Sequence, residues 1–173
     1  MSKKCWLLIV CLGLSWPSFS HGKGKGHPSK GNALVRYYSV PGQTLSQKEL
    51  QCLALNVFHE ARGESLAGQV GVAQVTLNRV EQQHRGKNTI CKVVFDPKQF
   101  SWTDKAGKLR TPTGKAWKKA LQVAQKVGLG LRIHGLQGVL YFHQRSHRPR
   151  WNQRMQLVLV INNHFFWRHY EIS

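Results

Sequence analysis

Residues 46–80 read SQKELQCLALNVFHEARGESLAGQVGVAQVTLNRV, and two helical patterns meet in the middle of this stretch. Ser46 followed by Glu49 has the spacing of a capping box, so a helix should begin there. Gly63 can supply the positive φ that favours a helix end. Between them, apolar residues recur on one helical face: Leu50, Leu53, Ala54, Val57, Phe58 and Ala61. Residues 65–80 are apolar nearly all round, which predicts a second helix in the middle of the domain.

The junction between the two helices concentrates charge. Glu60 falls in the last turn of the first helix, three residues after Val57 and at the edge of the apolar stripe. The negative end of the helix dipole and desolvation both disfavour its ionised form, so its pKa should be raised, as a general acid near neutral pH requires. Glu64 lies near the positive start of the second helix, where Arg62 could pair with it. The alternative is that Glu64 and Arg62 only brace the junction.

Residues 1–20 have the pattern of a cleavable secretory signal peptide. Two lysines precede an apolar run over residues 5–14, and the segment ends in the small-x-small pattern SFS. An uncleaved anchor is the alternative, but the run is about half the ~20 residues that a membrane span needs. We therefore expect an exported protein, secreted or periplasmic.

The rest of the chain divides into a linker and one domain. Residues 21–44 begin with HGKGKGHPSKGN, a Gly, Lys and His tract with little to bury, so we expect a flexible linker. Residues 45–173 hold enough apolar residues to bury a core. We expect this single domain to be a monomer.

The chain is strongly basic. Without the leader, 24 Lys and Arg residues stand against seven acids, a net charge of +17. Such a charge favours association with an anionic polymer. No zinc-finger, helix-turn-helix or RNP-type pattern is present, so we expect no specific nucleic-acid partner and instead electrostatic contact with anionic envelope polymers. Charge for solubility alone is the alternative.

Two cysteines remain after the leader, Cys52 and Cys91. In an oxidising compartment an isolated pair favours one disulfide. The bridge would close a loop of roughly 40 residues and stabilise the domain by up to ~4 kcal/mol. A catalytic thiol is the alternative, but no histidine or other base neighbours Cys52 in LQCLALN.

Five segments, spread over about residues 45–167, together resemble a known family. They are CLALNVFHEARGESLAGQVGVAQVTLNRV, ICKVVFDPKQFSWT, AWKKALQVAQ, VLYFHQRSHRPRWNQR and VINNHFF. They resemble the cell wall hydrolase family named for the spore cortex-lytic enzyme SleB. The resemblance implies an α+β, mainly helical catalytic domain, lysozyme-like and related to goose lysozyme and lytic transglycosylases, with a small C-terminal antiparallel sheet. It also implies cleavage of peptidoglycan between N-acetylmuramic acid and N-acetylglucosamine, leaving a 1,6-anhydro end.

Glu60 matches the catalytic glutamate of this family. As acid it would protonate the glycosidic oxygen, and as base it would take the proton from the muramic C6 hydroxyl, which replaces water as nucleophile. Ordinary glycosidases need a second carboxylate. Apart from Glu60 and Glu64, the chain has only these acids: Glu49, Glu81, Asp96, Asp104 and Glu171. This scarcity favours a single-acid mechanism, although Glu64 or Asp96 could position a water. No metal and no organic cofactor are implied.

Substrate-binding residues are expected on a loop and on a strand. The loop FDPKQFSW, residues 95–102, places aromatic rings beside polar groups, which suits a glycan groove, although aromatics are more often core. A strand within residues 138–144 and a hairpin about residues 162–163 predict the sheet. The expected substrate-binding residues are Glu64, Gln99, Phe100, Ser101, Trp102, Tyr141 and His143. For Tyr141 and His143 it is the resemblance that implies a strand face bordering the cleft, where Tyr141 could instead orient Glu60.

Three other functions remain open. A water-using muramidase would need a second carboxylate. A zinc-dependent N-acetylmuramoyl-L-alanine amidase would need ligands from the nominal set His59, Glu60, His143, His147 and His164, but the HExxH spacing is absent. A non-catalytic, basic wall-binding module would keep the fold without depending on Glu60.

Overall fold

The computed structural model describes residues 35–108, 110–147 and 149–170. The expected signal peptide and most of the expected linker lie outside these ranges. The ordered domain nevertheless begins before residue 45, because strand β1 (Tyr37–Ser39) pairs with β2 (Leu131–Ile133) in an antiparallel sheet. The flexible linker predicted for residues 21–44 is therefore wrong for its last part. A pairing partner some 95 positions away orders this part, and the local composition does not reveal it.

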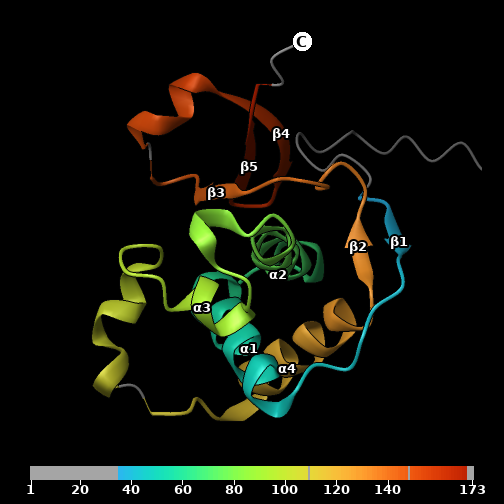
Figure 1. Ribbon diagram of the computed structural model, residues 1–173, viewed down its shortest axis with the longest axis vertical. Coiled ribbons are helices and arrows are strands. Elements are labelled where there is room, and N and C mark those ends of the chain that lie inside the picture. Colours follow the sequence, from blue (N-terminus) through green and yellow to red (C-terminus); the bar gives the residue numbers. More distant parts are fainter. Residues whose placement is uncertain (1–34, 109, 148, 171–173) are drawn as a thin grey trace, which may run out of the picture.

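Four α-helices form the larger part of the fold. They are α1 (Gln47–Ala61), α2 (Leu66–Glu81), α3 (Ile90–Val94) and α4 (Gly114–Gly128). Figure 1 shows α2 in the centre, with α1, α3 and α4 on one side and the C-terminal sheet on the other. Every residue of α2 from Gly68 to Arg79 is buried, as its nearly all-apolar sequence predicts.

The C-terminal sheet has three antiparallel strands in the order β3-β5-β4. The strands are β3 (Tyr141–Gln144), β4 (Met155–Ile161) and β5 (His164–His169). The predicted hairpin turn joins β4 to β5, with Asn162 in the left-handed region at φ 51°. Phe166 of β5 is fully buried against Gly71 of α2, where a larger residue would meet its ring. This contact holds the sheet on the central helix.

Three short 3-10 helices complete the described part: η1 (His84–Gly86), η2 (Ser101–Lys108) and η3 (Arg150–Arg154). η2 begins inside the segment expected to be a loop over residues 95–102, whose last two residues are therefore helical, and η3 precedes β4.

Both ends of α1 differ in detail from the prediction. Ser46 is the N-cap and accepts a hydrogen bond from the Glu49 backbone N–H at 3.3 Å, as expected. The Glu49 carboxylate does not complete the capping box but accepts from the backbone N–H of Ile90 at 2.6 Å, at the start of α3. Gly63 does not have a positive φ, and α1 ends with Arg62 still in the helical region. The glycine is not needed for this helix end because the chain turns directly into α2.

The predicted disulfide is present. Cys52 of α1 and Cys91 of α3 are bonded, with a Cα–Cα distance of 5.2 Å. The bridge and the Glu49–Ile90 hydrogen bond both attach α3 to α1. The short α3 helix is thereby fixed at a position that its own five residues could not secure.

Gly130 lies just before β2 and against Val40, just after β1, and its replacement should destabilise the domain. Its φ is 108°, and a Cβ atom there would collide with the Val40 carbonyl oxygen. We expect Gly130→Ala to lower the free energy of unfolding by at least about 2 kcal/mol, because backbone strain and steric overlap add. Denaturant unfolding would measure the loss.

Gly135→Ala is the matched control for this substitution. Gly135 also has a positive φ, 86°, but nothing lies within 4 Å of the point that an added Cβ atom would occupy. It should therefore lose only the strain contribution, and equal losses in the two variants would contradict the steric argument.

Candidate functional site

A cleft of about 980 Å³ lies between the helical part of the domain and the C-terminal sheet. It is lined by residues from α1, α2, the 98–102 segment, β3 and the segment that follows it, including η3. The lining residues are His59, Glu60, Arg79, Lys98, Gln99, Phe100, Ser101, Trp102, Tyr141, Phe142, His143, Gln144, Ser146, His147, Trp151 and Met155. The cleft thus brings together all but one of the expected catalytic and substrate-binding residues, the exception being Glu64.

Glu60 lies in the last turn of α1 and is half-buried in the cleft wall. Burial raises the pKa of its carboxyl above the ordinary value, while the Trp102 indole and the positive charge of Arg79 oppose that rise. The Trp102 Nε1–H has no acceptor at full hydrogen-bonding geometry, yet it is close enough to Glu60 to favour the charged form. The raised pKa agrees in direction with the expectation from the helix end, and burial is its largest cause.

Trp102 packs against His59, the residue of α1 that precedes Glu60. Its ring stacks on His59 with centroids 4.4 Å apart and an interplanar angle of 16°. Burial lowers the pKa of His59, with a smaller contribution from Arg62, so the stacked imidazole is favoured in its neutral form. The Trp102 ring therefore does more than fill the core, because it forms part of the immediate surroundings of Glu60.

Arg79 lines the cleft, is only 6% exposed and was not among the expected site residues. Its Nε donates to the backbone oxygen of Leu140 at 2.8 Å, just before β3, and its guanidinium lies over the Phe100 ring at 5.4 Å. Burial lowers the pKa of Arg79 to about 10, so it remains charged at neutral pH. Phe100 itself is only 5% exposed, so this ring supports Arg79 and offers little free face to a ligand.

Tyr141 and His143 both line the cleft, as expected for one strand face. The Tyr141 hydroxyl lies 3.1 Å from Nε2 of His169, so its partner in this structure is β5 and not Glu60. His143 is buried, stacks on Phe165 and donates from Nδ1 to the Gln144 carbonyl oxygen at 2.8 Å. Both side chains thus have partners within the sheet.

Trp151 is a cleft residue that the sequence reasoning missed. It is 38% exposed, belongs to η3 and lies 5.6 Å from the Tyr141 ring. An exposed indole on a cleft wall has the flat apolar face that suits a sugar ring. The sequence feature that could have pointed to Trp151 is an aromatic residue within the basic, turn-rich stretch RPRWNQR.

Glu64 does not line the cleft. Its carboxylate accepts hydrogen bonds from Nδ2 of Asn163 at 3.1 Å and from the Asn163 backbone N–H at 3.4 Å. Ser65 donates from its hydroxyl to Oδ1 of Asn162 at 2.7 Å. We call these four residues the hairpin clamp, because they join the α1–α2 junction to the β4–β5 turn. Arg62, the expected partner of Glu64, instead lies over the Phe58 ring at 5.2 Å.

The other described acids lie outside the cleft. Asp96 is only 5% exposed and forms ion pairs with Arg85 at 3.0 Å and Lys87 at 3.1 Å. Within the described ranges, Glu60 is the only acidic residue that lines the cleft. Neither Glu64 nor Asp96 is therefore at hand to position a water there.

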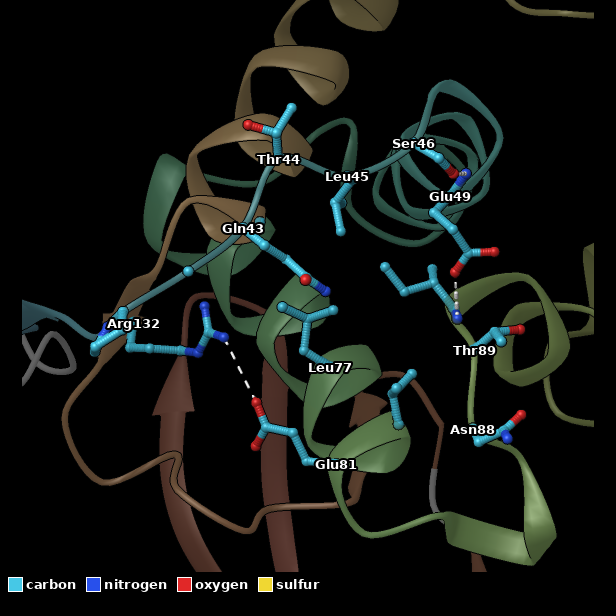
Figure 2. Close-up of a pocket in the computed structure, with 15 residues that line it drawn as sticks. Gln43, Thr44, Leu45, Ser46, Glu49, Leu77, Glu81, Asn88, Thr89 and Arg132 are labelled. Carbon is cyan, nitrogen blue, oxygen red and sulfur yellow. Dashed lines mark hydrogen bonds and ion pairs between the residues drawn. The ribbon is translucent and has the colours of Figure 1, made fainter.

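A second cavity, of about 680 Å³, lies at the other end of α1 (Figure 2). Its three charged lining residues already have partners: Arg132 pairs with Glu81 at 3.6 Å, and Glu49 accepts from Ile90. The lining includes none of the expected site residues. The cleft at Glu60 is therefore the candidate active site.

The nominal zinc ligands do not gather at one point. His59 stacks on Trp102, and His164 is fully buried, where desolvation lowers its pKa. In the part of the chain that the structure describes, no group of three or more His, Cys, Asp or Glu side chains could hold a metal ion. None of the helices in that part is long and apolar enough to span a membrane.

Comparison with known proteins identifies the family. Residues 63–167 match the family model described as cell wall hydrolase. A spore cortex-lytic enzyme of Bacillus cereus is 31% identical over 121 residues, which are 70% of this chain and 44% of the relative. One from Oceanobacillus iheyensis is 38% identical over 80 residues, 46% of this chain and 28% of the relative. The chain thus spans less than half the length of these curated relatives.

Two solved structures share the fold. The crystal structure of the catalytic domain of the Bacillus cereus SleB protein matches with a TM-score of 0.57 and 28% identity, covering 74% of this chain and 95% of that one. The catalytic domain of the germination-specific lytic transglycosylase SleB from Bacillus anthracis matches with a TM-score of 0.57 and 30% identity, covering 75% and 100%.

The chain therefore belongs to the SleB-type cell wall hydrolase family. Its α+β, mainly helical, lysozyme-like fold class is confirmed. Glu60 lies just before the start of the family match, so its role rests on the resemblance and on the geometry of the cleft.

The Trp102 indole N–H should tune the acidity of Glu60. Because this donor lowers the pKa of Glu60, Trp102→Phe should raise that pKa further while keeping a ring beside His59. A general acid must be protonated, so the alkaline limb of the pH–rate profile should move to higher pH. Trp117→Phe, in the core and outside the cleft, is the control and should leave the limb in place. If the alkaline limb of Trp102→Phe moved to lower pH, the role given to the Trp102 N–H in lowering the pKa of Glu60 would be contradicted.

Proposed function

We propose that this protein is a lytic transglycosylase that cleaves peptidoglycan glycan strands with Glu60 as both acid and base. One observation carries the proposal: among the described residues, the carboxyl of Glu60 is the only one that lines the cleft, and burial raises its pKa. Membership of the cell wall hydrolase family supports the substrate class. A relative with the same fold is named a germination-specific lytic transglycosylase, which supports the reaction type.

The first step is acid catalysis. Protonated Glu60 donates its proton to the glycosidic oxygen between N-acetylmuramic acid and N-acetylglucosamine, and the bond from that oxygen to the muramic anomeric carbon breaks. The departing sugar leaves as a neutral alcohol. A raised pKa favours this step because it keeps the carboxyl protonated closer to neutral pH.

The second step uses the same carboxylate as a base. Glu60 takes the proton from the muramic C6 hydroxyl, whose oxygen attacks the anomeric carbon. The product is a 1,6-anhydromuramoyl end, and Glu60 is protonated again for the next cycle. The positive charge of Arg79 stabilises the carboxylate form between the two steps.

Other cleft residues would bind the sugars. The side chains of Gln99 and Ser101 line the cleft and, within the described ranges, have no hydrogen-bond partner of their own, so sugar hydroxyl and acetamido groups can use them. Trp151 offers a ring face to the apolar side of a sugar. Tyr141 and His143 would form the facing wall, while Glu64 serves the hairpin clamp.

The alternatives have less support. A water-using muramidase requires a second carboxylate near the bond, whereas the described acids other than Glu60 lie outside the cleft. A zinc amidase requires three converging ligands, and the described histidines do not converge. For a chain of this family, action on the wall also implies export, so we infer a secreted or periplasmic enzyme whose leader is residues 1–20.

The test is digestion of purified peptidoglycan with the mature protein, with and without a chelator, followed by mass spectrometry of the new ends. Release of 1,6-anhydromuramoyl fragments in both conditions is the expected result. Reducing muramic ends would indicate a muramidase that uses water. Chelator-sensitive release of free stem peptides would overturn the proposal in favour of an amidase.

A further inference from the structure

Cationic residues outnumber acidic residues in the lining of the cleft. Glu60 is the only acidic lining residue in the described part of the chain, whereas Arg79 and Lys98 are both cationic lining residues. A neutral sugar backbone would gain little from such a cleft, but a substrate with carboxylates would be attracted to it.

The wall formed by the C-terminal sheet adds to this charge. Between Asp104 and Glu171 the sequence has no Asp or Glu at all, and this interval contains β3, η3, β4 and β5. Exposed cations flank the cleft-lining Trp151 and His147 in that wall: Arg145, Arg150 and Arg154. No acid of the same wall neutralises them.

Lys98 is the cation best placed to contact a ligand. It is exposed, lines the cleft and forms no ion pair with any residue whose side chain the structure describes. Its backbone has φ 64°, which is uncommon for a residue other than glycine and has an energetic cost. The turn is closed by the Gln99 backbone N–H, which donates to the Asp96 carbonyl oxygen at 3.1 Å. Buried Asp96 and Phe100 on either side fix the turn, so the backbone of Lys98 is held at the edge of the cleft.

We propose that this cleft selects glycan strands whose muramic residues carry stem peptides with free carboxylates, and that Lys98 binds one of these carboxylates. The inference rests on the proposed function, because it assigns the substrate class within the same cleft. In peptidoglycan the sugars themselves are neutral, and the ionised acids belong to the stem peptides attached through the muramic lactyl group. Glu60 and Lys98 line the same cleft, so Lys98 is the exposed cation there that the peptide of the reacting muramic residue would meet.

The experiment compares two forms of one substrate: purified glycan strands with intact stem peptides, and the same strands after chemical conversion of the free stem carboxylates to amides. Removal of the peptides would not serve, because hydrolysis of the lactyl amide leaves a new carboxylate on each muramic residue. Release of anhydro ends gives kcat and KM for the native protein, for Lys98→Gln and for Lys119→Gln. Lys119 is an exposed residue of α4 outside the cleft, so its replacement removes the same charge elsewhere. Equilibrium binding of both strand forms to the Glu60→Gln variant provides a readout that does not need turnover.

The native protein should have a lower KM for strands with free stem carboxylates than for amidated strands. Lys98→Gln should raise that KM by about two- to fivefold, the range that one exposed ion pair supports, with kcat little changed. Its KM for amidated strands should stay the same, and added salt should reduce the difference between the two proteins. Lys119→Gln should behave as the native protein with both substrates.

Three results would overturn the inference. They are equal affinity of the cleft for both strand forms, an equal effect of Lys98→Gln on both forms, and an equal effect of the two lysine substitutions, which would indicate overall charge alone. Failure of the proposed function looks different: neither strand form would then be cleaved by the native protein. In that case the binding preference of the Glu60→Gln variant still decides whether the cleft recognises the stem carboxylates.

Discussion

Glu60→Gln is expected to lower the rate of glycan cleavage by about 10²- to 10⁴-fold, the contribution usual for a positioned general acid or base. The amide has nearly the same shape but can neither donate a proton to the glycosidic oxygen nor accept one from the C6 hydroxyl. Release of 1,6-anhydro ends from purified peptidoglycan would measure the loss. Binding to the wall should persist, because the basic surface is unchanged.

The folding stability of Glu60→Gln should not fall with its activity. Burial raises the pKa of Glu60, so the native protein holds this proton more tightly than the unfolded chain does. As pH rises above the unfolded pKa, ionisation of the buried carboxyl costs stability. Glutamine cannot ionise, so at neutral pH the free energy of unfolding should be equal to or higher than that of the native protein. A clear loss of stability would mean that the carboxylate has a structural role instead.

Glu81→Gln is the matched control for Glu60→Gln. Glu81 is exposed at the end of α2, with 61% of its side chain accessible, and it lies outside the cleft. Its replacement makes the same chemical change and should preserve turnover. Native-like cleavage by Glu60→Gln would refute the mechanism. Loss of cleavage in both variants would show that the effect is not specific to Glu60.

Loss of the disulfide is the second large effect. Replacing Cys52 and Cys91 by serine should lower the free energy of unfolding by up to about 4 kcal/mol, because the bridge closes a long loop in the unfolded chain. The sequence separation is 39. At about 2–4 °C for each kcal/mol in a domain of this size, the melting temperature should fall by roughly 8–16 °C. Thermal unfolding followed by circular dichroism would measure it.

Reduction of the native protein tests the same bridge without a substitution. With a reductant present, the native protein should melt near the temperature of the double serine variant, and the variant itself should not respond to the reductant. Melting temperatures that do not differ between oxidised and reduced protein would show that the helical packing alone fixes α3.

The sequence predicts those parts of the fold that local pattern determines. The apolar spacing of residues 50–61 predicts the buried face of α1, and residues 65–80 predict the buried helix α2. Prediction from the sequence fails where contacts with a distant segment determine the local structure. Strand β1 forms because Leu131–Ile133 pairs with it, and the Glu49 carboxylate leaves its own helix for Ile90 because the disulfide brings α3 beside α1.

In the candidate site, too, local pattern predicts some residues, whereas distant contacts place the others. Glu60 could be selected from its position at a helix end against an apolar stripe, and the cleft gathers the 99–102 segment with Tyr141 and His143 as expected. Glu64 was expected beside the substrate, but Asn163 draws it into the hairpin clamp. Trp151 could not be found in this way, because only the return of the chain through η3 brings it to the cleft.

The hairpin clamp also sets the order in which the site can be completed. Glu64 and Asn163 are 99 positions apart, and Ser65 and Asn162 are 97 apart. Synthesis delivers α1 and α2 first, whereas the wall of β3 and η3 and the turn that secures the end of α1 come last. A chain that has folded only through α4 holds Glu60 in a helix but has one wall of its cleft missing. Catalytic competence is therefore acquired at the end of folding, when the latest strands reach the earliest helices.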